Sequence, residues 1–360
     1  MKFEINTTDL SEVLDVANSG PREAVHMFRL KVADGQLSAT IDNRDLSITA
    51  IADVTEQEPG ECNVPDRLAR VIKSKAVGNL TISLEDDHLK VSDATSTTEI
   101  ECRTLGEPNI AHTSEGEVEV DFDFFRELMD RVVPSAATTV DRPVLACVPL
   151  EVEDHHLRAV ATNSFRLSIL DFHSYRDNPD FTGLVPARLL RALEPLLDYG
   201  PVTVAKTEKV VTVRNGTLTI SAPIPEHQFP GYRQLIPDDE SATGTLAFKT
   251  EDMTAAITSV ATMSAPGPGV RLELEGDSTL TISGSILDMG RSSARVPVDL
   301  TGEWPATFNF RPDYLLDAIK AVGSDRVTIS STAPEKPLTI KAADYRDRDL
   351  TYLLMPIRVS

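Results

Sequence analysis

Residues 28–41 read Phe-Arg-Leu-Lys-Val-Ala-Asp-Gly-Gln-Leu-Ser-Ala-Thr-Ile, and they set a pattern that the rest of the chain repeats. Apolar and polar residues alternate up to Asp34 and Gly35, and they alternate again from Leu37 to Ile41. Alternation with a period of two is typical of a strand with one buried face, and Asp-Gly between two such runs favours a tight turn. The stretch therefore predicts an antiparallel β-hairpin.

Similar hairpin patterns return in residues 150–159 and 272–282, at a spacing of about 120 residues. Repetition at a fixed spacing indicates a chain built from similar structural units. Before each hairpin, apolar residues at positions i, i+3, i+4 and i+7 predict an amphipathic helix. A second helix, which starts beside a proline, and a second hairpin follow. We expect the first helices at residues 9–19, 123–133 and 251–263, and the second helices at residues 65–75, 186–197 and 312–322.

These elements predict an α+β protein of three similar domains, each with an antiparallel sheet and two helices on one face. Turn-rich, charged sequence separates the copies at residues 106–116 and 237–244. We therefore expect one domain at residues 1–115, a second at residues 116–241 and a third at residues 242–360. Because both joints are short, the domains are expected to pack edge to edge.

Charge and composition exclude several classes of protein. The chain has 35 Lys and Arg residues against 56 Asp and Glu residues, a net charge of −21, which argues against binding nucleic acid through a globally basic surface. No apolar run reaches the length of about 18 residues that a membrane span needs. The first residues read as a strand rather than a signal peptide, so we expect a cytoplasmic protein. Cys62, Cys102 and Cys147 fit no Cys-x-x-Cys spacing, and neither a metal site nor a disulfide framework is expected.

Three short motifs stand out beside the repeats. Residues 161–167 read Ala-Thr-Asn-Ser-Phe-Arg-Leu, residues 229–237 read Phe-Pro-Gly-Tyr-Arg-Gln-Leu-Ile-Pro, and residues 352–358 read Tyr-Leu-Leu-Met-Pro-Ile-Arg. The last motif is apolar, and Pro356 has no N–H for a sheet, so we expect a final strand followed by a tail docked along a surface. In this order on a threefold repeat, the motifs resemble the bacterial DNA polymerase III beta subunit, the replicative sliding clamp family. The resemblance covers essentially the whole chain.

The resemblance implies a protein with no catalytic residues and no cofactor. In this family two chains form a head-to-tail homodimer that closes as a ring around double-stranded DNA, so one chain with three clamp domains is half of the ring. Helices would line the inside, and the sheets would continue across the joints on the outside. The ring is the processivity factor of DNA polymerase III and acts on the nucleoid. A groove on one face binds short peptides of the polymerase alpha subunit, the clamp loader and other DNA-processing proteins.

The groove residues of the family carry over to this sequence position by position. They are Leu145, Thr162, Ser164, Phe165, Arg166, Leu167, Pro230, Gln234, Leu235, Pro337, Leu353, Leu354, Met355, Pro356, Ile357 and Arg358. Apolar members would form pockets for Leu and Phe side chains of an extended peptide. Arg166 and Arg358 would hold peptide carbonyl or carboxylate groups at the rim. Phe165 replaces a His and Gln234 an Arg of many relatives, so this groove is expected to be more apolar and less cationic.

Basic residues on the predicted helices are the candidates for contact with the DNA backbone. They are Arg70, Lys73, Arg126, Arg131, Arg188, Arg191, Arg311 and Lys320, together with Arg22, which matches a family position that touches DNA. A few such contacts would attract phosphates without reading bases. The helix at residues 9–19 has acidic residues and no basic one, so we expect DNA to be held loosely.

Other interpretations stay open. A specialised second clamp that replaces or titrates a housekeeping clamp would have the same architecture. A three-domain scaffold protein without DNA binding would be monomeric. Residues 154–156, Asp-His-His, have metal-ligand side chains, but neighbouring residues on a strand point to opposite faces, which argues against a metal site. The resemblance implies a dimer contact between the first and third domains, but the strength of that contact is open, because residues 261–269 are rich in small side chains.

Overall fold

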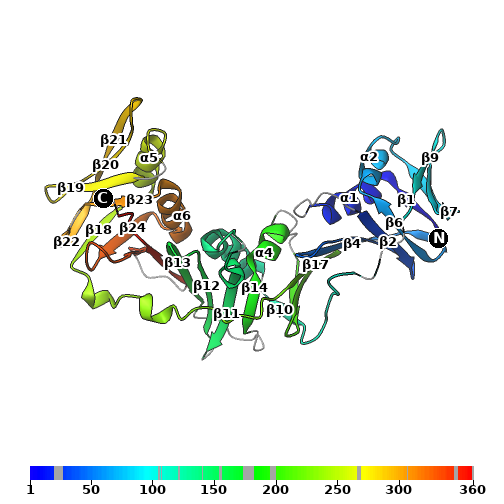
Figure 1. Cartoon of the computed structure of the whole chain (residues 1–360), viewed down its shortest axis with the longest axis horizontal. Helices are drawn as coiled ribbons and strands as arrows, with labels where there is room; N and C mark the ends of the chain where they lie inside the picture. The colour runs from blue at the N-terminus through cyan, green and yellow to red at the C-terminus, as the bar shows by residue number, and fades with distance from the viewer. Residues whose placement is uncertain are drawn as a thin grey trace. The chain divides into compact units, whose positions relative to one another are not determined.

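The computed structural model describes residues 1–19, 27–103, 106, 108–120, 122–139, 141–153, 156–172, 182–194, 200–265, 269–305, 307–343 and 348–358. The chain divides into two compact units (Figure 1). One unit consists of Met1–Phe125 and Arg188–Glu226, and the other of Arg126–Ala187 and His227–Ser360. Each unit combines one outer third of the sequence with part of the middle third. The three-domain boundaries expected from the sequence therefore stay predictions.

The first unit contains two antiparallel sheets within the described ranges. The larger has eight strands in the order β10-β15-β16-β17-β4-β3-β2-β6, and the smaller has five in the order β5-β1-β7-β8-β9. The strands of the larger sheet are β2 (Met27–Ala33), β3 (Gln36–Asp42), β4 (Ser47–Asp53), β6 (Gly60–Pro65), β10 (Val118–Val120), β15 (Val202–Lys206), β16 (Val210–Asn215) and β17 (Leu218–Pro223). Those of the smaller sheet are β1 (Lys2–Asn6), β5 (Thr55–Glu58), β7 (Asn79–Glu85), β8 (His88–Ser92) and β9 (Thr97–Glu101). The helices α1 (Thr7–Ala17) and α2 (Arg67–Lys73) complete the first third of the chain. Helix α4 (Ala187–Leu193) belongs to the first unit from Arg188 onward.

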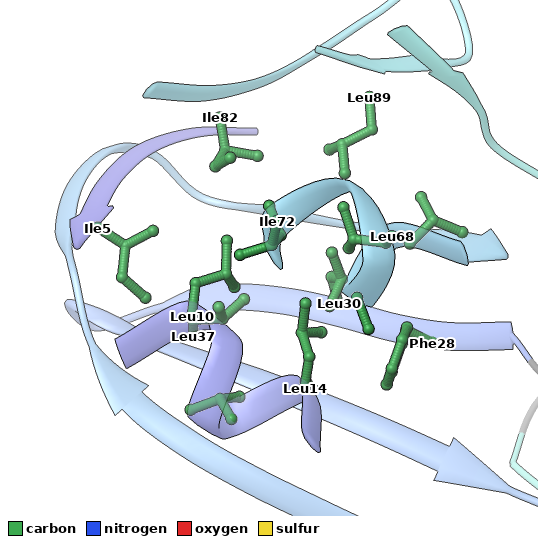
Figure 2. Packing of buried hydrophobic residues seen from close by; sticks show 14 of the residues in the cluster. Ile5, Leu10, Leu14, Phe28, Leu30, Leu37, Leu68, Ile72, Ile82 and Leu89 are labelled. Carbon is green, nitrogen blue, oxygen red and sulfur yellow. The ribbon is translucent and has the colours of Figure 1, made fainter. Parts of the chain in front are cut away.

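The opening stretch of the sequence forms the predicted hairpin, β2 and β3, with Leu30 opposite Ala39 and Val32 opposite Leu37. Asp34 and Gly35 in its turn have φ values of 53° and 75°, in the left-handed region that a two-residue hairpin turn requires. The inward side chains belong to one buried cluster that also includes residues of α1, α2 and the smaller sheet (Figure 2). This core therefore joins both sheets to both helices.

The second unit repeats this plan. In the described part of the chain it has a nine-stranded antiparallel sheet in the order β14-β11-β12-β13-β26-β25-β24-β18-β22 and a four-stranded one in the order β21-β20-β19-β23. The strands of the larger sheet are β11 (Cys147–Glu153), β12 (His156–Thr162), β13 (Arg166–Phe172), β14 (Gly183–Pro186), β18 (Gly244–Lys249), β22 (Asp299–Gly302), β24 (Arg326–Ser331), β25 (Leu338–Ala342) and β26 (Arg348–Leu354). Those of the smaller sheet are β19 (Val270–Glu275), β20 (Thr279–Ile286), β21 (Gly290–Pro297) and β23 (Phe308–Phe310).

Helices of the second unit include α5 (Thr250–Ala261) and α6 (Pro312–Val322), which contact each other. A third helix, α3 (Phe122–Glu127), begins in the first unit and continues as the π-helix η1 (Leu128–Val132). Four short 3-10 helices are η2 (Val133–Ser135), η3 (Pro143–Ala146), η5 (Arg233–Leu235) and η6 (Asp239–Ser241), counted among the described residues.

Both large sheets continue from one third of the sequence into the next. In the first unit β17 pairs with β4, with Ile220 opposite Ile48. In the second unit β13 pairs with β26, with Leu167 opposite Leu353. The expectation that sheets run on across the joints is confirmed at both places.

The apolar faces of the helices are confirmed, but three details of the helix predictions are wrong. Residues 123–133 change from α to π geometry after Glu127. The helices α2 and α4 begin after Pro65 and Pro186, because these prolines end the edge strands β6 and β14, where a missing N–H breaks no ladder. Pro312 is the first residue of its helix, as predicted.

A polar network that includes three buried hydroxyl groups lies where β4 pairs with β17. His112, in the connection between β9 and β10, contacts the Thr49 hydroxyl through Nε2 and the Ser221 hydroxyl through Nδ1, both at 2.7 Å. Ser221 in turn lies 2.6 Å from the hydroxyl of Thr212. Burial, with the positive charge of Arg214, lowers the pKa of His112 to about 4. The network therefore favours a neutral imidazole in the folded protein.

The pKa of His112 predicts loss of stability in acid. Because the folded-state pKa lies below the ordinary value of 6.5, this contribution is complete above pH 6.5 and is lost as the pH falls toward 4. Over that window we expect the free energy of unfolding to fall more in the wild type than in His112→Gln, measured by urea unfolding. His227, which lies outside this network, provides the matched control, His227→Gln, which should keep the wild-type slope. The same pH dependence in wild type and H112Q would contradict the assignment.

Candidate functional site

The turn between β12 and β13 is held by its own side chains. The Thr162 hydroxyl donates to the Arg166 carbonyl at 2.7 Å. The Asn163 side-chain oxygen accepts from the backbone N–H groups of Phe165 at 3.1 Å and Arg166 at 3.2 Å. Ser164 has a φ of 75°, a conformation uncommon for residues other than glycine. The turn presents Phe165, whose exposed fraction is 62%, to solvent.

The C-terminal tail lies beside this turn. After β26 ends at Leu354, the Met355 N–H donates to the Phe165 carbonyl at 2.9 Å, and the Ile357 N–H donates to the Asn309 carbonyl of β23 at 2.7 Å. The tail therefore leaves the sheet around Pro356 and docks on two neighbouring elements, as the sequence predicted. Met355 remains 37% exposed.

A third segment, residues 229–236, covers the sheet close to the turn and the tail. Tyr232 packs in a buried cluster with Leu167 and Leu353, and its hydroxyl donates to Glu151 at 2.9 Å. Burial, with the Glu151 carboxylate as hydrogen-bond acceptor, raises the pKa of Tyr232, so the phenol stays protonated. The 3-10 helix η5 in this segment exposes Leu235, with an exposed fraction of 55%.

Phe165, Leu235 and Met355 form what we call the C-terminal patch. Each is a large apolar side chain open to solvent, and the three belong to segments that share hydrogen bonds or one buried cluster. Among the described residues, the other large apolar side chains with comparable exposure are Val77, Leu287 and Met289. Exposed apolar side chains that gather in one place are typical of an interaction surface.

The sixteen predicted groove residues all lie in the second unit. Five of them are buried: Leu145, Arg166, Leu167, Leu353 and Leu354. The others are exposed or half-buried: Thr162, Ser164, Phe165, Pro230, Gln234, Leu235, Pro337, Met355, Pro356, Ile357 and Arg358. Leu353 and Leu167 lie in the cluster beneath residues 229–236, so they support the C-terminal patch from below.

The expectation that Arg166 holds a peptide at the rim is wrong about the position of its side chain. Arg166 is only 8% exposed, and its guanidinium donates to Asp317 at 2.6 Å and to the Tyr352 hydroxyl at 3.2 Å. This pairing could not be predicted from the sequence pattern, since Asp317 lies 151 residues further along the chain. Arg358 is exposed, and its role at the rim stays a prediction.

The predicted DNA-facing residues differ in their ion pairs within the chain and in the exposure of their side chains. Lys73 pairs with Asp15 at 2.8 Å, Arg188 with Asp45 at 3.1 Å and Arg311 with Asp313 at 2.6 Å. Arg70, Arg126 and Lys320 are exposed, and no ion pair within the described residues involves them. Arg191 is half-buried, and Arg22 lies outside the described residues.

The side chain of Arg131 also lies elsewhere than predicted. Its guanidinium is largely buried and donates to the Ala321 and Val322 carbonyls at 2.6 and 2.8 Å, and to Glu127 at 3.1 Å. These carbonyls belong to the last turn of α6, where a cation satisfies acceptors that the helix leaves unpaired. This side chain therefore caps a helix and does not face solvent as predicted.

Neither a metal cluster nor a membrane-spanning helix occurs among the described residues. No group of three or more His, Cys, Asp or Glu side chains is placed there to hold a metal ion; Asp154 and His155 of the metal alternative lie outside those ranges. Of the helices described, none has the length and apolar character to cross a membrane.

Two family models match consecutive parts of the chain. Residues 119–231 match the model of the DNA polymerase III beta subunit central domain, and residues 233–358 match that of its C-terminal domain. The beta sliding clamp of Vibrio cholerae is 26% identical over 376 residues, and that of Bacillus subtilis is 22% identical over 384 residues. These matches cover 99–100% of this chain and all of each relative. The clamp of Streptococcus pneumoniae is 27% identical over 241 residues, but the match spans 62% of that protein's length.

Solved structures give the same fold. A DNA polymerase sliding clamp from Bacillus subtilis matches with a TM-score of 0.90 at 19% identity, and both chains are fully covered. The DNA polymerase III subunit beta from Pseudomonas aeruginosa matches with a TM-score of 0.89 at 23% identity, over 99% of this chain and all of that one. The likeness extends through the first third of the chain, which the two family models do not reach.

Proposed function

The chain belongs to the DNA polymerase III beta subunit family, and from that membership we propose that it is a sliding clamp that encircles double-stranded DNA. It is a non-catalytic processivity subunit that keeps a replicative polymerase at its template. Its place of action is nucleoid DNA in the cytoplasm. The observation that carries the proposal is the threefold α+β pattern joined by two continuous sheets, because such stiff units suit a ring that holds DNA by enclosure.

The C-terminal patch is the proposed docking site for short peptides of the polymerase alpha subunit, the clamp loader and other DNA-processing proteins. Exposed Phe165, Leu235 and Met355 offer apolar contacts, and the predicted groove residues around them complete the site. Such a surface favours apolar and aromatic side chains of an extended peptide. Gln234 is exposed and uncharged, so peptide carboxylates add little to binding at that position.

Contact with DNA is proposed to be weak and independent of sequence. Asp15, Asp45 and Asp313 pair with three of the candidate cations and compete with phosphates for them. Each phosphate contact that is lost lowers both the affinity and its salt dependence. Enclosure, rather than charge, would therefore keep the protein on DNA while it slides.

A head-to-tail homodimer completes the proposed ring. The edge strand β9 of the first unit has Glu99 and Glu101, and the edge strand β21 of the second unit has Arg291 and Arg295, which are all exposed. Unpaired sheet edges of opposite charge favour strand addition between two chains. The first third of one chain would thus pair with the last third of the other, twice in each dimer.

Retention on circular and linear DNA tests the sliding-clamp proposal. We expect the protein, loaded on nicked circular DNA by its cognate clamp loader, to co-elute with that DNA in gel filtration and to be lost once the DNA is cut. The link is topological, and a cut gives the ring a free end to slide off. Sedimentation of the same preparation should show the dimer. Equal retention on circular and cut DNA, or a monomer at micromolar concentration, would refute the ring.

The docking proposal predicts that Phe165→Ser weakens peptide binding by about tenfold, since an exposed aromatic contact at the centre of such a site contributes about 1 to 2 kcal/mol. A fluorescently labelled peptide Leu-Asp-Leu-Phe is a suitable probe, measured by anisotropy. Leu287→Ser is the matched control, because Leu287 is 88% exposed in the same unit but lies in the turn between β20 and β21. Deletion of residues 355–360 should abolish binding. Wild-type affinity in F165S and in the deletion variant would remove the C-terminal patch from the proposal.

A further inference from the structure

The buried guanidinium of Arg166 joins the turn behind the C-terminal patch to helix α6. It donates to Asp317 of α6 at 2.6 Å and also to the carbonyl of Pro134 in η2. Its charge lies over the ring of Tyr314, also on α6, at 4.1 Å from the ring centre. Helix α6 and η2 therefore fix the position of this one side chain from two sides.

The fixed position of the Arg166 side chain also restricts its neighbours in the chain. Successive side chains of a strand point to opposite faces, so a residue held on one face fixes the direction of the next strand residue. Arg166 is the first residue of β13 and points toward α6, so Leu167 lies on the other face, in the cluster under residues 229–236. Phe165 directly precedes Arg166 in the turn and is exposed. The Phe165 carbonyl is also the acceptor for Met355, so the direction of the turn determines where the tail docks.

The turn needs such support from outside. Ser164 holds a left-handed backbone conformation that costs about 1 kcal/mol or more for a residue with a side chain. Thr162 and Asn163 fix the turn from within, but their bonds do not decide which way the whole turn faces. Arg166, at the end of the turn, has the side chain that bonds to the helices α6 and η2.

We propose that Arg166 is a positioning residue of the peptide-binding site: its bonds to α6 and η2 hold Phe165 and the tail in the binding arrangement, and it does not touch the peptide. The inference rests on the proposed function, because it concerns the same site. It assigns to Asp317, which lies on α6 and outside the predicted groove, an indirect part in peptide affinity.

Arg131 provides a matched comparison. It is also largely buried, and it also bonds from the middle third of the chain to α6, through the Ala321 and Val322 carbonyls. Its contacts on α6 are carbonyls of the last turn, about one helical turn beyond Asp317, and none of them is to the turn at residues 162–166. Loss of Arg131 therefore weakens the attachment of α6 without releasing the turn.

The experiment compares Arg166→Gln, Asp317→Asn and Arg131→Gln in the full-length protein. Anisotropy gives the affinity for the labelled peptide Leu-Asp-Leu-Phe and for its neutral analogue Leu-Asn-Leu-Phe. Hydrogen exchange followed by mass spectrometry reports the Met355 amide without any peptide. Thermal unfolding of each variant shows whether it is folded, and Arg166→Lys replaces R166Q if the latter fails to fold.

We expect R166Q and D317N to weaken both peptides about equally, by roughly tenfold, as lost hydrogen bonds to charged groups would. The Met355 amide should exchange faster in both variants, and R131Q should match the wild type in affinity and exchange. A loss in R166Q confined to the acidic peptide would mean direct contact and overturn the proposal, as would wild-type affinity and exchange in D317N. If the wild type binds neither peptide, the proposed function fails, and the exchange rate of the Met355 amide alone tests the positioning role of Arg166. Faster exchange in R166Q and D317N supports that role. Unchanged exchange in both variants overturns it.

Discussion

The pairing of β13 with β26 is the interaction on which the proposed site depends. It runs antiparallel from Arg166 opposite Leu354 to Phe172 opposite Arg348, and it joins the middle third of the sequence to the last. A shift of one residue would move every side chain of a strand to the other face. Leu167 and Leu353 would then leave the cluster under residues 229–236, and the tail would no longer meet the turn at residues 162–166. The register therefore sets both the core and the exposed surface.

The two seams between thirds of the sequence are built differently. At the seam between β13 and β26, apolar residues pack on one face, and the buried guanidinium of Arg166, paired with the half-exposed Asp317, lies on the other. At the seam between β4 and β17, buried hydroxyl groups meet a neutral histidine. Buried polar groups are costly unless they are fully bonded, so each seam favours one arrangement over its alternatives. Rigid seams of this kind suit a protein whose proposed function is to keep a fixed shape around DNA.

Patterns with short periods were predictable, and contacts between distant residues were not. The hairpin at residues 28–41 and the buried faces of α1, α5 and α6 follow from apolar residues at periods of two and 3.6. The surroundings of Arg166 and His112 depend on residues more than a hundred positions away, such as Asp317 and Ser221. A charged residue in a motif reads as exposed until its partner is known, which is why Arg166 and Arg131 were placed at the surface. The start of α2 was missed because a proline also suits an edge strand.

A ring that encloses DNA without strong binding stays on it in a different way from a protein held by charge, and the motion of single molecules on DNA distinguishes the two. Labelled protein would be loaded on a stretched linear duplex whose two ends are blocked, and then washed at about 0.5 M salt, where the Debye length is only about 4 Å and phosphate contacts are weak. We expect molecules that diffuse along the duplex, survive the wash and leave only after one end is freed. Molecules that dissociate from internal sites as the salt rises, with both ends still blocked, would contradict it.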